Sequence, residues 1–230
     1  MPRMPFPIQT VDGAKALETW ERIRTENRGT PVILGHDERL HHLSELLSGS
    51  DLAETVSTIE RQAKALPFPE AWRQWRRQNV DSFVVQDEDD FTVTGGDWPE
   101  TVTPQDFSSH LDLLTQKPLE RVHIAILPTT DPTLIPAYLR FGGWNECPDA
   151  SVQVAAARHW HAKYGAEIVA VTDDIVECRV RRRPATRDEA MQLALEQFEF
   201  CSDIVLQGTG TLEPLAATLM TSDWWFFWWD

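Results

Sequence analysis

An aromatic run at residues 224–229, Trp-Trp-Phe-Phe-Trp-Trp, constrains the fold of this chain more than any other feature. Successive side chains of a β-strand point to opposite faces, so the rings of this run would alternate between the two faces of a sheet. Each ring can bury roughly 150–250 Å2. A strand that is aromatic on both faces is expected inside a sheet that helices cover on both sides. The run therefore predicts a central C-terminal strand.

The rest of the second half shows strands that alternate with helices. Short apolar runs predict strands at 122–127, 167–171 and 175–180, and helical spacing of apolar residues predicts helices at 149–163, 188–200 and 212–220. Strands that alternate with helices of this length are typical of an α/β fold. We therefore predict a mixed sheet with helices on both faces.

The first half is richer in helices. Helices are predicted over 12–27 and within 37–77, with a short buried strand at 31–35. Two apolar segments, 83–85 and 91–93, flank the acidic residues 87–90 and indicate a hairpin. Glycines and prolines at 95–104 mark a linker. The predicted division is a helix-rich region with a hairpin, 1–105, followed by an α/β domain, 106–230.

The charge of the chain limits its partners. Asp and Glu number 36 against 21 Lys and Arg, which gives a net charge of -15. This field repels phosphate backbones and anionic lipids, so neither nucleic acid nor a membrane surface is an expected partner. The acidic run at 87–90 is either a solvated loop or a docking site for a basic protein.

No run approaches the ~20 apolar residues that span a bilayer, and three cysteines without a C-x-x-C pair suggest no disulfide framework. A cytoplasmic protein is expected.

A long string of unusual composition occupies residues 137–148: Ala-Tyr-Leu-Arg-Phe-Gly-Gly-Trp-Asn-Glu-Cys-Pro. It is followed in order by Trp160, Tyr-Gly-Ala-Glu at 164–167, Glu196-Gln197, Cys201, Asp203, Gln207-Gly208, Leu-Ala-Ala at 215–217 and Trp-Trp-Asp at 228–230. This order and spacing resembles the bacterial family catalogued as domain of unknown function 4253, over roughly residues 120–230. The resemblance implies a bacterial cytoplasmic α/β protein and brings no activity with it.

Cys147 is the sharpest candidate for chemistry. It precedes Pro148, and proline is favoured at the first position of a helix, so Cys147 is predicted at the N-cap of the helix that follows. The helix dipole would there lower the pKa of the thiol and favour a thiolate nucleophile. His123, on a predicted strand, is the histidine best placed to act as its base. The alternative is that Cys147 is a small residue in a glycine-rich turn.

Further candidates surround the same turn. Trp144, Asn145 and Glu146 lead into a helix N-terminus that could hold a polar ligand, although a tight turn locked by Trp144 explains them equally well. Glu196, on an inward-facing helix, would have a raised pKa suited to acid–base work. Gln207 is a further ligand-binding candidate. The alternative is that Gln207 and Glu196 both have a purely structural role. No spacing matches a zinc or calcium site, so no metal and no cofactor are predicted.

Two functions are compatible with the sequence. The first is a non-catalytic binding or interaction protein, toxin-neutralising or regulatory, which meets a basic protein partner or a small polar ligand; the net charge and the lack of a catalytic constellation favour it. The second is a small-molecule enzyme with a pocket around residues 142–148 and Cys147 as thiolate. The sequence predicts neither a substrate nor an oligomeric state.

Overall fold

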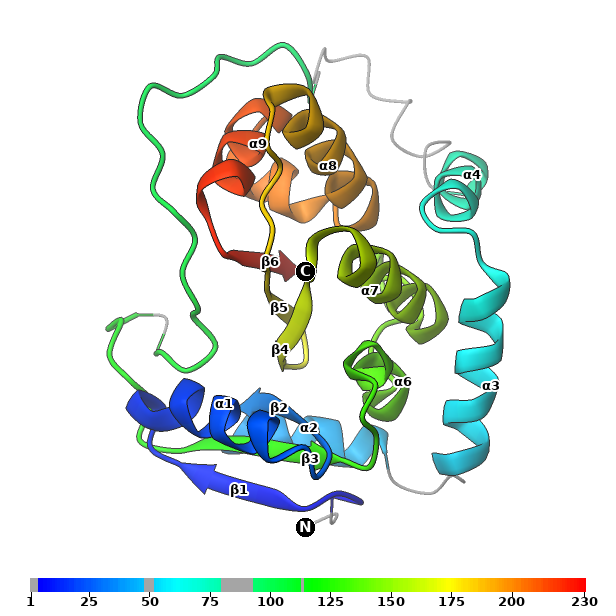
Figure 1. Ribbon diagram of the computed structural model, residues 1–230, viewed down its shortest axis with the longest axis vertical. Helices are drawn as coiled ribbons and strands as arrows, with labels where there is room; N and C mark the ends of the chain where they lie inside the picture. Colours follow the sequence, from blue (N-terminus) through cyan, green and yellow to red (C-terminus); the bar gives the residue numbers. More distant parts are fainter. Residues whose placement is uncertain (1–3, 48–51, 80–92, 113) are drawn as a thin grey trace.

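The computed structural model describes residues 4–47, 52–79, 93–112 and 114–230 (Figure 1). These residues form a mixed α/β fold around one six-stranded sheet, as predicted. The strands are β1 Ile8–Val11, β2 Thr30–Gly35, β3 Val122–Leu127, β4 Glu167–Val171, β5 Ile175–Arg179 and β6 Trp224–Trp228. The helices before β3 are η1 Gly13–Lys15, α1 Ala16–Glu26, α2 Asp37–Leu46, α3 Leu52–Ala65 and α4 Glu70–Asn79. Those after β3 are η2 Pro132–Leu134, α6 Ile135–Leu139, α7 Ala150–Tyr164, α8 Arg187–Phe200, η3 Ile204–Thr209 and α9 Leu212–Thr221.

The strand order is β1-β3-β2-β4-β5-β6. All neighbours are antiparallel except β2 and β4, which run parallel with Ile33 opposite Ala170. Because β1 and β2 pair with β3 and β4, strands from both predicted regions share this sheet. The domain boundary at residue 105 stays a prediction. The hairpin predicted around residues 87–90 lies outside the described residues, apart from Val93 at its end.

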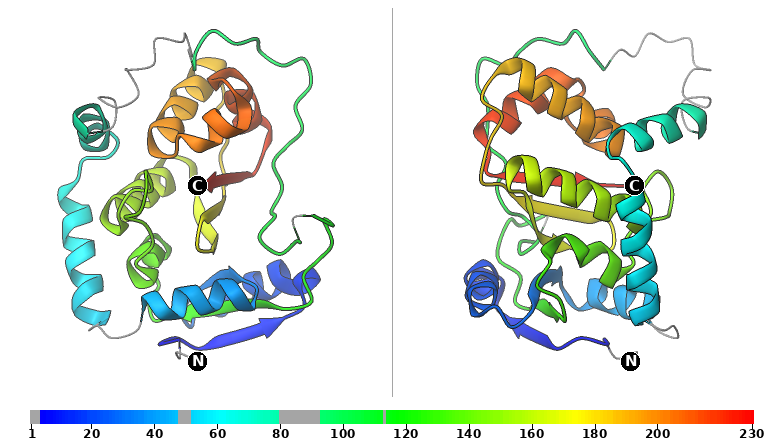
Figure 2. Two further views of the ribbon diagram at one scale, coloured as in Figure 1. Left: turned by 180° about the vertical axis from the view of Figure 1, so that it is seen from behind. Right: turned by 45° about the vertical axis from the view of Figure 1, so that its right-hand side comes forward.

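Alternate residues of the central strands bury opposite faces of the sheet. On one face, Trp20 and Ile23 of α1 pack with Ile33 of β2. On the other face, Val32 and Leu34 join a larger core with α2, α7 and α8. Figures 1 and 2 show α1 and α2 on opposite sides of β2 and β3. Burial on both faces explains why every residue of β2 is buried, a pattern typical of a central strand with a parallel neighbour.

The predicted central position of the aromatic strand is wrong. β6 ends the sheet and pairs with β5 along one side. Its odd-numbered rings are buried in the core with α7 and α8, whereas its even-numbered rings are half-buried. On the even-numbered face, Phe107 of an irregular segment, not a helix, stacks on Trp224 with 5.0 Å between ring centroids. Aromatic residues on both faces therefore did not require an interior strand.

Helix ends follow local sequence signals. Asp149 caps α7, because its Oδ1 accepts hydrogen bonds from the backbone N–H groups of Ser151 and Val152. Gly165 ends the same helix with φ 64°, in the left-handed conformation that glycine adopts without penalty. Among the described residues, no helix combines the length and the apolar character that a bilayer crossing requires.

Candidate binding pocket

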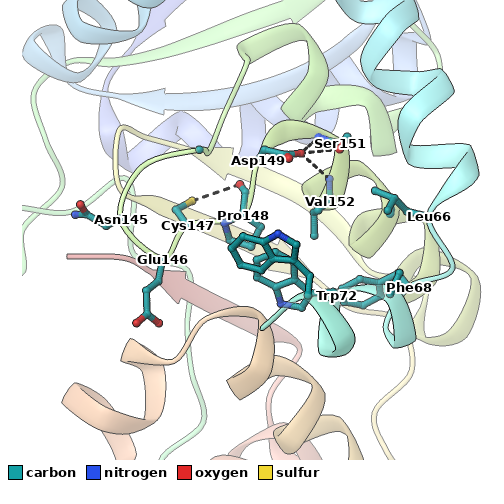
Figure 3. A pocket seen from close by; sticks show the side chains of 14 residues that line it. Leu66, Phe68, Trp72, Asn145, Glu146, Cys147, Pro148, Asp149, Ser151 and Val152 are labelled. Carbon is teal, nitrogen blue, oxygen red and sulfur yellow. Dashed lines mark hydrogen bonds between the residues drawn. The ribbon is translucent and has the colours of Figure 1, made fainter. Parts of the chain in front are cut away.

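A pocket of about 500 Å3 lies between the α3–α4 connection, the start of α7 and the turn that precedes α7 (Figure 3). This volume falls within the range of small-molecule sites, roughly 300–1,000 Å3. Its apolar wall consists of Leu66, Phe68, Ala71, Trp72, Trp75, Val152 and Ala155. Its remaining wall consists of Gly143, Asn145, Glu146, Cys147, Pro148, Asp149 and Ser151. Three of the predicted site residues, Asn145, Glu146 and Cys147, are therefore brought together here.

Two tryptophans of α4 form the aromatic part of the pocket. Trp72 and Trp75 stack with 4.8 Å between ring centroids and an interplanar angle of 11°. They are three residues apart, a spacing that places both side chains on one helical face. Trp72 is buried, whereas Trp75 is 48% exposed. Neither tryptophan was among the predicted site residues, although the pair at this spacing after Pro67-Phe68-Pro69 was a signal that could have indicated them.

Side chains of α4 fix it against the end of α8. The indole Nε1 of Trp72 and Nη1 of Arg76 both donate to the backbone carbonyl of Glu199, at 2.7 and 2.9 Å. Arg73 forms an ion pair with the Glu199 carboxylate. The guanidinium of Arg76, largely buried, also lies 3.3 Å from the carboxylate of Glu146. These bonds hold the aromatic wall opposite the turn.

The turn at residues 142–148 requires glycine at its first position. Gly142 has φ +101°, and a Cβ atom on it would lie 1.8 Å from the backbone oxygen of Pro148. The turn is closed by a hydrogen bond from Gly143 N–H to the oxygen of Cys147, at 3.1 Å. Cys147 N–H in turn donates to the oxygen of Trp144, at 2.8 Å. This close packing presents residues 143–149 to the pocket as one rigid wall.

The predicted N-cap thiolate at Cys147 is wrong. Asp149, two residues later, is the N-cap of α7, and the Cys147 side chain is buried. Burial, and to a lesser degree the neighbouring thiol of Cys201, raises the pKa of Cys147 far above its usual value, although Gln153 donates a hydrogen bond to its sulfur at 3.5 Å. Within the described parts of the chain, no histidine or carboxylate is bonded to this thiol. Cys147 therefore carries a neutral thiol.

Carboxylates supply the charge in the pocket wall. Glu146 forms an ion pair with Arg76 and accepts a hydrogen bond from Ser202 Oγ at 2.7 Å. Asp149 is exposed, and its Oδ1 accepts hydrogen bonds from the first backbone N–H groups of α7 and from Ser151 Oγ. Asn145 is turned away, because its Nδ2 donates to the backbone oxygen of Asp230 at 2.6 Å. Figure 3 shows Asn145 and Glu146 at the end of the pocket away from Leu66 and Phe68. None of the described residues of the wall is Lys, Arg or His.

The other acid–base candidates lie outside the pocket. His123 in β3 is buried with Nε2 2.7 Å from Asp37 Oδ1 and Nδ1 2.9 Å from Thr10 Oγ1, so both ring nitrogens have partners. Glu196 is buried in α8. Its predicted raised pKa is wrong: burial acts to raise the pKa, but the imidazole of His159, with Nε2 3.1 Å from the carboxylate, and the hydrogen bond from Trp160 Nε1 outweigh it and the pKa is lowered.

The remaining candidates, Trp144 and Gln207, also lie elsewhere. Trp144 is half-buried and its ring packs edge-on against Phe141 at 5.0 Å, which supports the role of locking the turn. Gln207 lies in the π-helical segment η3 and donates from Nε2 to Asp203 Oδ1 at 3.2 Å. It lines a separate groove beside β6. The structure thus divides the predicted site residues among several places.

No curated protein and no solved structure matches this chain. Residues 123–230 match the model of a family described as "Domain of unknown function (DUF4253)". The matched residues include strands β3 to β6, the turn at 142–148 and helices α7 to α9, whereas the aromatic wall of the pocket, from α3 and α4, precedes them. The C-terminal part of this chain, residues 123–230, is therefore similar to the DUF4253 family.

Proposed function

We propose that this chain is a non-catalytic binding protein whose pocket holds a small organic cation. The ligand would have an aromatic or apolar body that lies against Trp72 and Trp75, and a positively charged group near Asp149. The observation that carries this proposal is the wall composition of the 500 Å3 pocket: aromatic rings and carboxylates, without a basic side chain among its described residues.

Three features of the chain favour a cation. At an exposed site an indole attracts a cation by about 0.5–1 kcal/mol, and the side chain of Trp75, which lines the pocket, is 48% exposed. Arg76 pairs with Glu146, whereas Asp149 has no cationic partner among the described residues. The net charge of -15 attracts cations and repels anions at longer range.

The alternative of a thiol enzyme has less support. A nucleophilic cysteine needs a thiolate and an adjacent base. Cys147 is buried, its pKa is raised, and it bonds to Gln153 and to a backbone oxygen instead of a base. The proposal therefore assigns Cys147 to the structure of the turn.

Calorimetric titration with phenethylamine, an aromatic ring with an ammonium group, tests the proposal. Asp149→Asn removes the charge but keeps an N-cap residue of equal quality, so the fold of α7 is preserved. We expect this change to weaken binding about three- to fivefold, the value of an exposed ion pair. We expect a loss of similar size in Trp75→Ala, because the cation–π contact is removed.

Asp12→Asn is the matched control, because Asp12 also caps a helical turn but does not line the pocket. It should bind phenethylamine as the unmodified protein does. Equal affinity of all variants, or a loss that Asp12→Asn shares with Asp149→Asn, would refute binding at this pocket.

A further inference from the structure

A second cavity, a groove of about 370 Å3, runs along the outer side of β6. Its other walls come from α8, η3 and α9 and from Thr103 and Gln105, whereas β5 contributes none of its described lining. It therefore lies on the side of β6 that faces away from the sheet. It shares no residue with the pocket beside α4.

The main chain of β6 presents hydrogen-bonding groups to this groove. Trp229 N–H donates to Asp174 O at 3.1 Å, and Val180 N–H donates to Asp223 O at 2.8 Å. In an antiparallel pair the bonded residues alternate, so the odd-numbered residues of β6 bond to β5. The N–H and C=O groups of Phe226 consequently point outward. The outward C=O of Trp228 already accepts from Cys201 Sγ at 2.9 Å, so the main-chain groups of Phe226 are the part of this edge that can serve as a template for a further strand.

Gln197 adds an unsatisfied donor to the same groove. Its side chain is 1% exposed, and its Nε2 atom is buried without a hydrogen-bond partner. Buried polar atoms without partners are rare, because each costs the free energy of lost hydration. A ligand with a carbonyl oxygen would supply the missing acceptor.

The groove also favours a positively charged occupant. Its one charged lining residue among those described is Asp203, which accepts a hydrogen bond from the backbone N–H of Asp230. The half-buried rings of Trp224, Phe226 and Trp228 line it as well, and such rings attract Lys and Arg side chains. The net charge of -15 acts in the same direction.

We propose that β6 binds an extended, basic segment of a partner protein, which adds to the sheet as a further strand. The main-chain groups of Phe226 would bond to the segment, Gln197 Nε2 would donate to one of its carbonyl oxygens, and its Lys or Arg side chains would lie near Asp203 and the tryptophan rings. This mode gives affinity through main-chain hydrogen bonds and specificity through alternate side chains.

Two variants of one residue separate main-chain from side-chain binding. Phe226→Pro removes the outward N–H group and leaves the bonds to β5, because residue 226 does not donate to β5; proline is tolerated on edge strands. Phe226→Ala removes the same ring but keeps the N–H group. Peptides selected from a random display library on the unmodified chain would then be measured against both variants by fluorescence polarisation, with circular dichroism as a check of folding.

We expect the selected peptides to be rich in Lys and Arg and to bind Phe226→Pro about tenfold more weakly than Phe226→Ala. Gln197→Leu should weaken peptide binding as well, yet raise the unfolding temperature of the free protein, because an unsatisfied buried amide is replaced by an apolar group. Glu-for-Lys versions of the peptides should bind weakly.

Several results would overturn the proposal. The first is that no peptide can be selected. The second is that Phe226→Pro and Phe226→Ala bind the selected peptides with equal affinity. The third is that Gln197→Leu binds these peptides as tightly as the unmodified protein does. Dimerisation of the free protein that Phe226→Pro abolishes, measured by sedimentation velocity, would assign the edge to a second copy of the chain instead.

Discussion

The one-sided burial of β6 predicts that two adjacent phenylalanines contribute very differently to stability. Phe227 is 1% exposed and packs against Trp160, Phe200 and Trp229 with ring centroids 5.3, 5.4 and 6.2 Å away. Phe227→Ala should therefore lower the free energy of unfolding by about 3–5 kcal/mol, the usual cost of a deleted core phenylalanine. Phe226 is half-buried on the other face, so Phe226→Ala should cost about 1–2 kcal/mol.

Urea unfolding followed by circular dichroism measures this difference. With a slope of about 3 kcal/mol per M, a difference of about 2 kcal/mol separates the two midpoints by about 0.7 M urea. The two variants serve as controls for each other, because they remove the same side chain from neighbouring positions of one strand. Equal losses would refute the one-sided burial of β6 and would show that the rings on both of its faces are equally buried.

Two further predictions concern buried groups. Burial raises the pKa of Glu177 above 4.5, even though the backbone N–H groups of Ser108 and Ser109 donate hydrogen bonds to its carboxylate. The protonated Glu177 side chain therefore contributes to stability below about pH 4.5. This contribution is lost as pH rises through the higher pKa of the folded state. Urea unfolding of Glu177→Gln between about pH 4.5 and pH 8 should accordingly show a stability that improves relative to the unmodified protein as pH rises; parallel pH profiles would contradict this. All three cysteines are buried and have raised pKa values; the pKa of Cys201 is raised to about 12. Ellman's reagent should therefore modify the folded chain about a thousandfold more slowly than the unfolded chain. One rapidly modified thiol in the folded chain would support the hypothesis of a nucleophilic cysteine.

Sequence periodicity predicted most of the local structure of the C-terminal half. The predicted strand at 122–127 and the predicted helix at 188–200 agree with β3 and α8 within one residue at each end. Strand order was not accessible in this way, because it depends on pairing between distant segments. The aromatic run shows this limit: alternation indicated a strand, but the stacking of Phe107 on Trp224 at one face is a tertiary contact.

The candidate site was predicted in part. The turn at 142–148 was recognised from its glycines and does form a pocket wall. The opposite wall comes from Phe68, Trp72 and Trp75, about 70 residues earlier in the chain. The bonds that Trp72 and Arg73 of α4 make to Glu199 could not be read from periodicity. The pKa of Glu196 was misjudged for a related reason, because its partner His159 lies on another helix.

Binding of organic cations by the pocket can be tested with a matched pair of ligands. Phenethylamine and 3-phenylpropionate present the same ring with opposite charges, so titration calorimetry of both with the unmodified protein isolates the effect of charge. We predict that the amine binds at least about tenfold more tightly, because Asp149, Trp75 and the net charge of -15 all favour a cation. Equal affinity for both ligands, or tighter binding of the carboxylate, would contradict the proposed function.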